Sequence, residues 1–301
     1  VAGFGPLTEL LENRSVEEIF IEGPRISFID DSGRLQSHVV STTEAELRQV
    51  VDRLLAGTNR RLDSSNAIEQ AHVLGGNARL TAVVPPGSAR LSATIRKYTV
   101  AEETLGSMVA LDSLSSTAAA FLWATAQATT SILYSGATGA GKTTLMSAWL
   151  RAVPNDQCIR IVEEVRELHI PLPPHSSYYE ASPVTLQGDR RFSLRDLVKV
   201  SLAQRVDLLC VGEVRGAEAL DMLQAMNTGH EGSLTTIHAN TPRDAVARME
   251  TLIMMAGFEL PVKAMRSQIA SAVDVIIQAN RLQGGKRRVT HITEIVGMEQ
   301  D

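Results

Sequence analysis

A glycine-rich segment constrains this chain more than any other feature. Residues 136–143 read GATGAGKT, follow the apolar run 131–135 and precede a stretch with helical patterning that ends near Ala152. A strand, a loop of small residues and a helix in this order place successive backbone N–H groups around a phosphate, at the positive end of the helix. We therefore predict an α/β domain with a parallel sheet and a nucleoside-triphosphate site at this loop.

The composition limits the class of protein. The chain has 301 residues, of which 44% are hydrophobic and 21% charged, and this is sufficient for two globular domains. A formal net charge of -5 gives no general attraction to nucleic acid. The sequence has no apolar run of about 18 residues and its first residues lack the pattern of a secretory signal. We expect a cytoplasmic protein without a membrane-spanning helix.

The order of the expected elements predicts two domains and a linker. Residues 1–103 mix short strands with one clear helix, in which Thr43 and Glu46 form a capping box. Residues 104–115 are polar and irregular, which is typical of a linker. From 116 to 301, apolar strands alternate with helices, and this indicates a parallel sheet covered on both faces.

The residues of the glycine-rich loop suit a triphosphate and a divalent cation. The ammonium group of Lys142 can reach the β- and γ-phosphates, and the hydroxyl of Thr143 can coordinate Mg²⁺. ATP and Mg²⁺ are therefore the expected cofactors. The predicted nucleotide-binding residues are Gly136, Ala137, Thr138, Gly139, Ala140, Gly141, Lys142, Thr143 and Thr144.

Carboxylates follow two apolar strands, where a hydrolase needs a group that orients or deprotonates water. Glu213 follows the run 208–212, and Glu163 follows the run 158–162. Both glutamates are candidate catalytic residues, and Glu164 is a candidate ligand of Mg²⁺. The alternative is that these are ordinary solvated carboxylates in loops.

Two histidines, His230 and His238, bracket a β-prone apolar run. A histidine near a γ-phosphate can donate a hydrogen bond to it or respond to its loss. Each histidine taken alone would more often be a structural hydrogen-bonding residue. We predict that both couple the state of the phosphate to movement. Metal binding by these histidines is not expected, because no Cys or His cluster has the spacing of a zinc site.

Together these motifs resemble those of the secretion ATPases of type II and type IV systems, and especially the CpaF/TadA branch that assembles Flp pili. That family combines a Walker A loop, an acidic "Asp box", a Walker B segment and a "His box". They correspond to residues 136–143, 161–164, 211–216 and 228–240. The stretch 212–230 is the part most similar to the CpaF branch.

The resemblance implies a small N-terminal PAS-like α/β domain followed by a RecA-like P-loop ATPase domain, with nucleotide between them, in a homo-oligomer that is a hexamer. It also implies that Glu163 and Glu213 position Mg²⁺ and the attacking water. Arg79 and Arg96 match arginines that approach the phosphates from the N-terminal domain, although without the family they would be read as solvated strand residues. The implied partners are inner-membrane platform proteins of a pilus or secretion system, and the implied location is the cytoplasmic side of the inner membrane.

The function predicted on this basis is that of a Mg²⁺-dependent ATPase motor for Flp/Tad-type pilus assembly or protein secretion. A conjugation or type IV secretion ATPase is the closest alternative, because it would use the same machinery with a different partner. A nucleic-acid motor would share the ATPase core, but the sequence lacks the aromatic residues interleaved with basic ones that single-strand binding uses. No nucleic-acid partner is therefore expected. A nucleotide-dependent switch without turnover is the third alternative.

Overall fold

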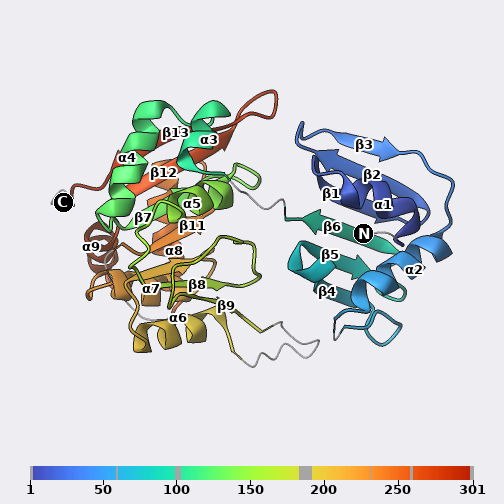
Figure 1. Cartoon of the computed structure of the whole chain (residues 1–301). Coiled ribbons are helices and arrows are strands. Elements are labelled where there is room, and N and C mark those ends of the chain that lie inside the picture. The colour runs from blue at the N-terminus through green and yellow to red at the C-terminus, as the bar shows by residue number, and fades with distance from the viewer. Residues whose placement is uncertain are drawn as a thin grey trace. The chain divides into compact units, whose positions relative to one another are not determined.

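The computed structural model describes residues 3–58, 60–98, 103–182, 192–230, 232–257 and 260–298. Its contacts divide the chain into two compact units, Val1–Val100 and Ala101–Asp301. In Figure 1 the first unit is coloured from blue to teal and the second from green to red. Each unit has its own sheet and its own hydrophobic core.

The N-terminal unit is an antiparallel sheet with helices packed on one face. The six strands have the order β3-β2-β1-β6-β5-β4. The core lies between this sheet and helix α2, and the capping box predicted for α2 is present, with Thr43 Oγ1 accepting from the Glu46 backbone N–H at 3.2 Å. The elements are η1 (Gly5–Leu7), α1 (Thr8–Glu12), β1 (Val16–Glu22), β2 (Arg25–Asp30), β3 (Leu35–His38), α2 (Glu44–Leu55), β4 (Ile68–Val73), η2 (Leu74–Gly76), β5 (Ala78–Val83) and β6 (Ser92–Lys97).

The C-terminal unit is a sheet covered by helices on both faces (Figure 1). Its seven strands have the order β13-β12-β7-β11-β10-β8-β9, and all neighbours are parallel except β12 and β13. The elements are α3 (Leu105–Ala110), α4 (Ser116–Gln127), β7 (Ile132–Ser135), α5 (Lys142–Leu150), β8 (Ile159–Glu163), β9 (Ser177–Glu180), α6 (Leu194–Ala203), β10 (Leu208–Val211), α7 (Glu218–Met226), β11 (Leu234–Ile237), α8 (Pro242–Met254), α9 (Val262–Ala272), β12 (Val275–Arg281) and β13 (Arg287–Glu294).

Two cores explain why the strands read as continuous apolar runs. One core joins alternate strand residues to α6, α7, α8 and α9, and the other joins the intervening residues to α3, α4 and α5. Leu133 of β7 belongs to the first core, while Ile132 and Tyr134 belong to the second. Both faces of the central strands are therefore removed from water, as the sequence predicts for a parallel sheet.

The segment 104–115, which we expected to be a linker, is part of the C-terminal unit. It contains α3, whose first turn is closed by a capping box between Thr104 and Ser107. The apolar side chains Leu105 and Met108 are buried in the core with α4 and α5. The polar capping residues made this short helix look irregular in the sequence.

The parallel strands decide which motifs meet. In a parallel sheet the carboxyl ends of the strands lie at one edge. The loops that follow β7, β8, β10 and β11 therefore share that edge. That edge carries Lys142 at the start of α5 and Glu163 at the end of β8. It also carries Glu213 and His238, which follow β10 and β11. The segment that contains His230 precedes β11 and lies at the other edge.

Candidate active site

The glycine-rich loop joins β7 to α5 and is packed tightly against the neighbouring strand. A Cβ atom on Gly136 would lie 2.3 Å from the carbonyl oxygen of Ala279 on β12, so the first loop position accepts only glycine. Gly141 caps the start of α5 with a φ of 92°, a left-handed value that glycine adopts without strain. The loop therefore ends at the amino terminus of α5, where backbone N–H groups and the helix dipole favour an anion.

Lys142 begins α5 and is almost fully buried. Its Nζ atom donates to the backbone oxygens of Gly136 at 2.8 Å and of Ala137 at 3.0 Å, and it lies 3.3 Å from Nδ1 of His238. The ammonium group thus folds back over its own loop. Phosphate oxygens are stronger acceptors than these carbonyl groups for a charged donor, so a bound triphosphate can displace them.

The ring of His238 connects Lys142 to Glu213. Nε2 of His238 lies 2.7 Å from Oε1 of Glu213, so Nε2 carries a proton and Nδ1 accepts from Lys142. Partial burial and the charge of Lys142 lower the pKa of His238 from its ordinary value of 6.5, while Glu213 opposes them. The other oxygen of Glu213, Oε2, accepts from Arg215 at 2.6 Å. A continuous chain of polar contacts therefore runs from the glycine-rich loop to the carboxylate after β10.

Gln278 of β12 holds the loop that follows His238, and our sequence reasoning missed it. This side chain is fully buried, and its Nε2 atom donates to the backbone oxygens of Ala239 at 3.3 Å and of Asn240 at 3.1 Å. Its backbone is paired with Ser135, the last residue of β7. A lone amide at the end of the apolar run 275–277 is the signal that could have indicated it.

Glu163 is close to Glu213 in the fold but faces a different environment. It is 4% exposed, and its carboxylate accepts from the backbone N–H groups of Glu167 at 3.2 Å and of Leu168 at 3.2 Å. Burial raises the pKa of Glu163 to about 8, against the opposing effect of these two N–H groups. A Cβ on Gly212 would lie 2.7 Å from Cγ of Glu163, so the glutamate packs directly on the backbone before Glu213.

The donor groups near the loop suit Mg²⁺ held largely by phosphate. Thr143 lies in the first turn of α5, beside Lys142. The pKa of Arg215 is raised, mainly by its hydrogen bond to Glu213 and also by the charges of Glu167 and Glu164. Within the described ranges, no group of three or more His, Cys, Asp or Glu side chains could hold a metal ion by itself. Mg²⁺ in phosphate-transfer sites takes one or two protein oxygens together with substrate oxygens and water.

The structure does not place His230 with the other predicted site residues. Its backbone N–H binds the oxygen of Ala225 at 3.2 Å, and its own carbonyl accepts from Ser233 Oγ at 2.7 Å. Nδ1 of His230 is buried and has no hydrogen-bond partner among the described residues. Strand β11 separates the two histidines and spans on the order of 13 Å at about 3.3 Å per residue. The expectation that both histidines approach one γ-phosphate therefore fails for His230 within this unit.

Arg79 and Arg96 lie on one face of the N-terminal sheet. They are directly opposite each other on β5 and β6, and Nε of Arg96 lies 3.5 Å from Oε1 of Glu18 on β1. Their neighbours Leu80 and Ile95 are fully buried and point into the core with α2. Both arginines therefore point away from that core. Their approach to the phosphates stays a prediction.

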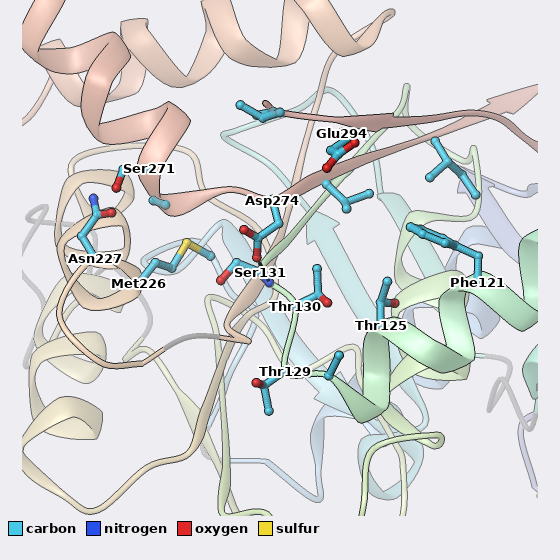
Figure 2. Close-up of a pocket in the computed structure, with 15 residues that line it drawn as sticks. Phe121, Thr125, Thr129, Thr130, Ser131, Met226, Asn227, Ser271, Asp274 and Glu294 are labelled. Carbon is cyan, nitrogen blue, oxygen red and sulfur yellow. Dashed lines mark hydrogen bonds between the residues drawn. The ribbon is translucent and has the colours of Figure 1, made fainter. Parts of the chain in front are cut away.

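Figure 2 shows a pocket of about 860 Å³, whose lining includes Ser131 and Asp274. These residues precede β7 and β12, so the pocket lies at the edge of the C-terminal sheet opposite the glycine-rich loop. Ser131 and Asp274 lie side by side within it, and the carboxylate of Asp274 accepts from the backbone N–H of Ser131 at 2.8 Å. Phe121 and Thr125 of α4 form one wall. These residues precede β7 and β12 or lie on α4, so the pocket is separate from the candidate nucleotide site.

The comparisons with known proteins agree on one family. The family described as "Type II/IV secretion system protein" matches residues 1–288. A protein of Mycobacterium tuberculosis (strain H37Rv), provisionally named conjugal transfer protein Rv3659c, is 36% identical over 299 residues, 97% of this chain and 84% of the relative. Conjugal transfer protein TrbB of Rhizobium radiobacter is 29% identical over 95% of this chain and 86% of its own. The crystal structure of the VirB11 ATPase from the Brucella suis type IV secretion system has a TM-score of 0.54 at 22% identity, over 96% of this chain and 92% of that one.

These findings confirm the predicted mixed α/β fold, with an N-terminal domain and a RecA-like ATPase domain. The relatives carry names of conjugal transfer and type IV secretion, so the CpaF/TadA branch is not confirmed. Among the described helices, none has the length and apolar character needed to cross a membrane. The chain belongs to the type II/IV secretion system protein family.

Proposed function

We propose that the chain is the ATPase motor of a conjugative or type IV secretion apparatus and that it uses ATP with Mg²⁺. In this proposal it works as a homo-oligomer, a hexamer, at the cytoplasmic face of the inner membrane. The observation that carries the ATPase chemistry is the contact chain from Lys142 through His238 to Glu213. The names of the conjugal transfer relatives support the choice of apparatus.

In this proposal each residue of the contact chain has a separate role. The backbone N–H groups of the loop and Lys142 bind the phosphates. Thr143 with Glu164 would hold Mg²⁺, and the ion would supply positive charge that favours phosphoryl transfer. Glu213 orients the attacking water and accepts its proton. His238 holds the carboxylate of Glu213 in place through Nε2, so that its orientation is coupled to the position of Lys142.

The remaining predicted residues act from the margins of the site. Glu163 anchors the backbone of residues 167 and 168, and in this way it positions Glu164 and the loop beside Glu213. Arg96, with Arg79, supplies positive charge from the N-terminal unit during transfer. His230 transmits movement at the other edge of the sheet and does not touch the phosphates of the same unit.

The test of the ATPase assignment is Glu213→Gln. The amide keeps the shape of the side chain but accepts a proton poorly, so the variant should bind ATP and release phosphate at a rate lowered at least about a hundredfold. The matched control is Glu250→Gln. Like Glu213, Glu250 pairs with an arginine, Arg266, at 2.8 Å, but Glu250 lies on α8 and not after β10. Near-normal phosphate release by Glu213→Gln, or an equal loss in the control, would contradict the assignment.

The apparatus is tested separately in the native host. A strain that carries Lys142→Ala in place of the normal protein should lose DNA or protein transfer while its surface pili of the Flp type are unchanged. The opposite pattern would support the pilus alternative, which the similarity of residues 212–230 to the CpaF branch favours. Strong stimulation of the purified ATPase by single-stranded DNA would support a nucleic-acid motor instead.

A further inference from the structure

The hairpin of β12 and β13 extends past the end of β7 and borders the glycine-rich loop. Gln278 is paired with Ser135, and the next carbonyl, that of Ala279, lies against Gly136. Strand β12 then continues to Arg281, which is paired with Arg287 at the start of β13. The register of two strands therefore brings a pair of arginines to the loop from more than a hundred residues away in the sequence.

Arg287 is fixed to the loop. Its Nε atom donates to the backbone oxygen of Gly139 at 3.0 Å. A Cβ on Gly141 would lie 3.5 Å from Cδ of Arg287, so the aliphatic part of the arginine covers the loop at this glycine. The side chain thus supports the loop from the side of the hairpin.

Arg281 reaches the same loop but is not engaged by it. Its Nη1 atom lies 3.9 Å from the position of a Cβ on Gly139, which places the guanidinium group beside the loop. Arg281 is exposed and has no hydrogen-bond or ion-pair partner among the described residues. A guanidinium group is therefore available next to the N–H groups that suit a phosphate.

Two carboxylates of the C-terminal unit, those of Glu213 and Asp112, already have cationic partners. Glu213 already binds His238 and Arg215. On the same hairpin, Lys286 and Arg288 are both engaged by Asp112. The guanidinium group of Arg281 therefore adds positive charge beside the loop, and this charge is complementary to a polyanion. A guanidinium group can bind phosphate oxygens through two parallel N–H···O bonds.

We propose that Arg281 is a nucleotide-binding residue that contacts the polyphosphate of ATP within the same subunit as the glycine-rich loop, and that Arg287 positions the loop for this contact. The inference rests on the proposed ATP site and adds a cation to it that comes from neither the N-terminal unit nor another subunit. Arg281 is a binding residue in this role, and Arg287 is a positioning residue.

The test compares the affinity of the full chain for ATP and ADP, measured by displacement of a fluorescent nucleotide in the presence of Mg²⁺. Arg281→Ala should weaken both affinities about tenfold, the effect expected for one charged hydrogen-bonding contact. Arg281→Lys should restore only part of the loss, because an ammonium group cannot make the two parallel bonds. The dependence of affinity on salt should also be weaker in Arg281→Ala.

The matched control is Lys286→Ala. It removes one positive charge from the same hairpin, but Lys286 faces Asp112 at 3.4 Å. Its affinity should stay within about twofold of the wild type, because exposed pairs contribute little. The thermal unfolding temperature without nucleotide should be the same for Arg281→Ala and Lys286→Ala, which shows that both fold.

The outcomes separate this inference from the proposed function. If Arg281→Ala binds ATP as the wild type does while Lys142→Ala does not, the ATP site stands and the role of Arg281 is refuted. Equal losses in Arg281→Ala and Lys286→Ala would also refute it, because only general charge would matter. If the wild-type chain itself fails to bind ATP, the proposed function fails first.

Discussion

Nε2 of His238 lies 2.7 Å from Oε1 of Glu213, while Nδ1 of the same ring lies 3.3 Å from Nζ of Lys142. One neutral imidazole therefore contacts both the lysine that would bind the phosphates and the carboxylate that would orient water. A protonated ring could not accept from Lys142, so this contact chain requires the neutral form.

We expect His238→Ala to lower the rate of phosphate release on the order of a hundredfold, because a misplaced catalytic carboxylate costs about that much. ATP affinity should change little. His291→Ala is the control, since His291 is exposed on β13 and its Nδ1 atom lies 3.0 Å from Oγ1 of its neighbour Thr290. Steady-state phosphate release and nucleotide binding measure the two effects, and a matching loss of ATP affinity and folding stability would favour a structural role for His238.

The pH dependence of turnover should report the same ring. Burial, then the charge of Lys142, lowers the pKa of His238 from 6.5, so the native ring is neutral at and above that pH. Stability that depends on the neutral ring should be complete above pH 6.5 and should fall as the pH drops below it, since the unfolded state binds the proton more readily. Activity should fall when the native ring takes up a proton, and the lowered pKa places this below pH 6.5. The turnover rate of the wild type should therefore fall at acid pH. The part of this fall that comes from protonation of His238 should be absent from His238→Ala. An identical acid limb in both proteins would contradict this.

Lys142→Ala should abolish hydrolysis and weaken ATP binding, because the ammonium group neutralises charge on the β- and γ-phosphates. It should also raise the pKa of His238, since the charge of Lys142 is one of the causes that lower it. Phosphate release, nucleotide titration and an NMR titration of the histidine ring measure these results. Wild-type turnover in the variant would refute the assignment of the loop.

Glu163→Gln should change how stability depends on pH. Burial raises the pKa of Glu163 from 4.5 to about 8, so between these values the native state keeps a proton that the unfolded state has lost. Stability from this group therefore falls as the pH rises from 4.5 to 8, by at most about 5 kcal/mol. The variant carries no titrating group at residue 163. Urea unfolding at pH 5 and pH 8 should therefore show that the free energy of unfolding of the variant, relative to that of the wild type, increases with pH. Parallel pH profiles for the two proteins would show that Glu163 is ionised in the native state.

Gln278→Met should slow turnover without weakening ATP binding. Methionine fills a similar volume but leaves the carbonyl groups of Ala239 and Asn240 without their buried donor, at a cost of about 1–3 kcal/mol. The loop after His238 should then shift, and the ring should lose its position between Lys142 and Glu213. Gln224→Met on the exposed side of α7 is the control. If the variant loses stability but keeps its turnover per folded molecule, Gln278 does not position the histidine.

Features that depend on neighbouring residues could be predicted from the sequence. The capping box of Thr43 and Glu46 and the cap that Ser193 provides to α6 involve residues three positions apart, so their pattern is legible in the chain. The strand, loop and helix around Gly136 are equally local. By contrast, the sequence predicts a linker where α3 lies, because the helical character of α3 comes from burial of Leu105 and Met108 in a core formed by distant residues.

The sequence by itself determined the chemistry of the site, because a loop of glycines before Lys142 and the carboxylates after apolar strands suffice to indicate ATP hydrolysis. Only the tertiary structure decided which residues share that site. The direction of β11 puts His238 beside Lys142 and His230 at the far edge, and the pairing of β12 with β7 brings Gln278 and Arg281 to the loop. Such placements depend on the pairing of strands that are distant in the chain, and no local pattern of residues encodes that pairing.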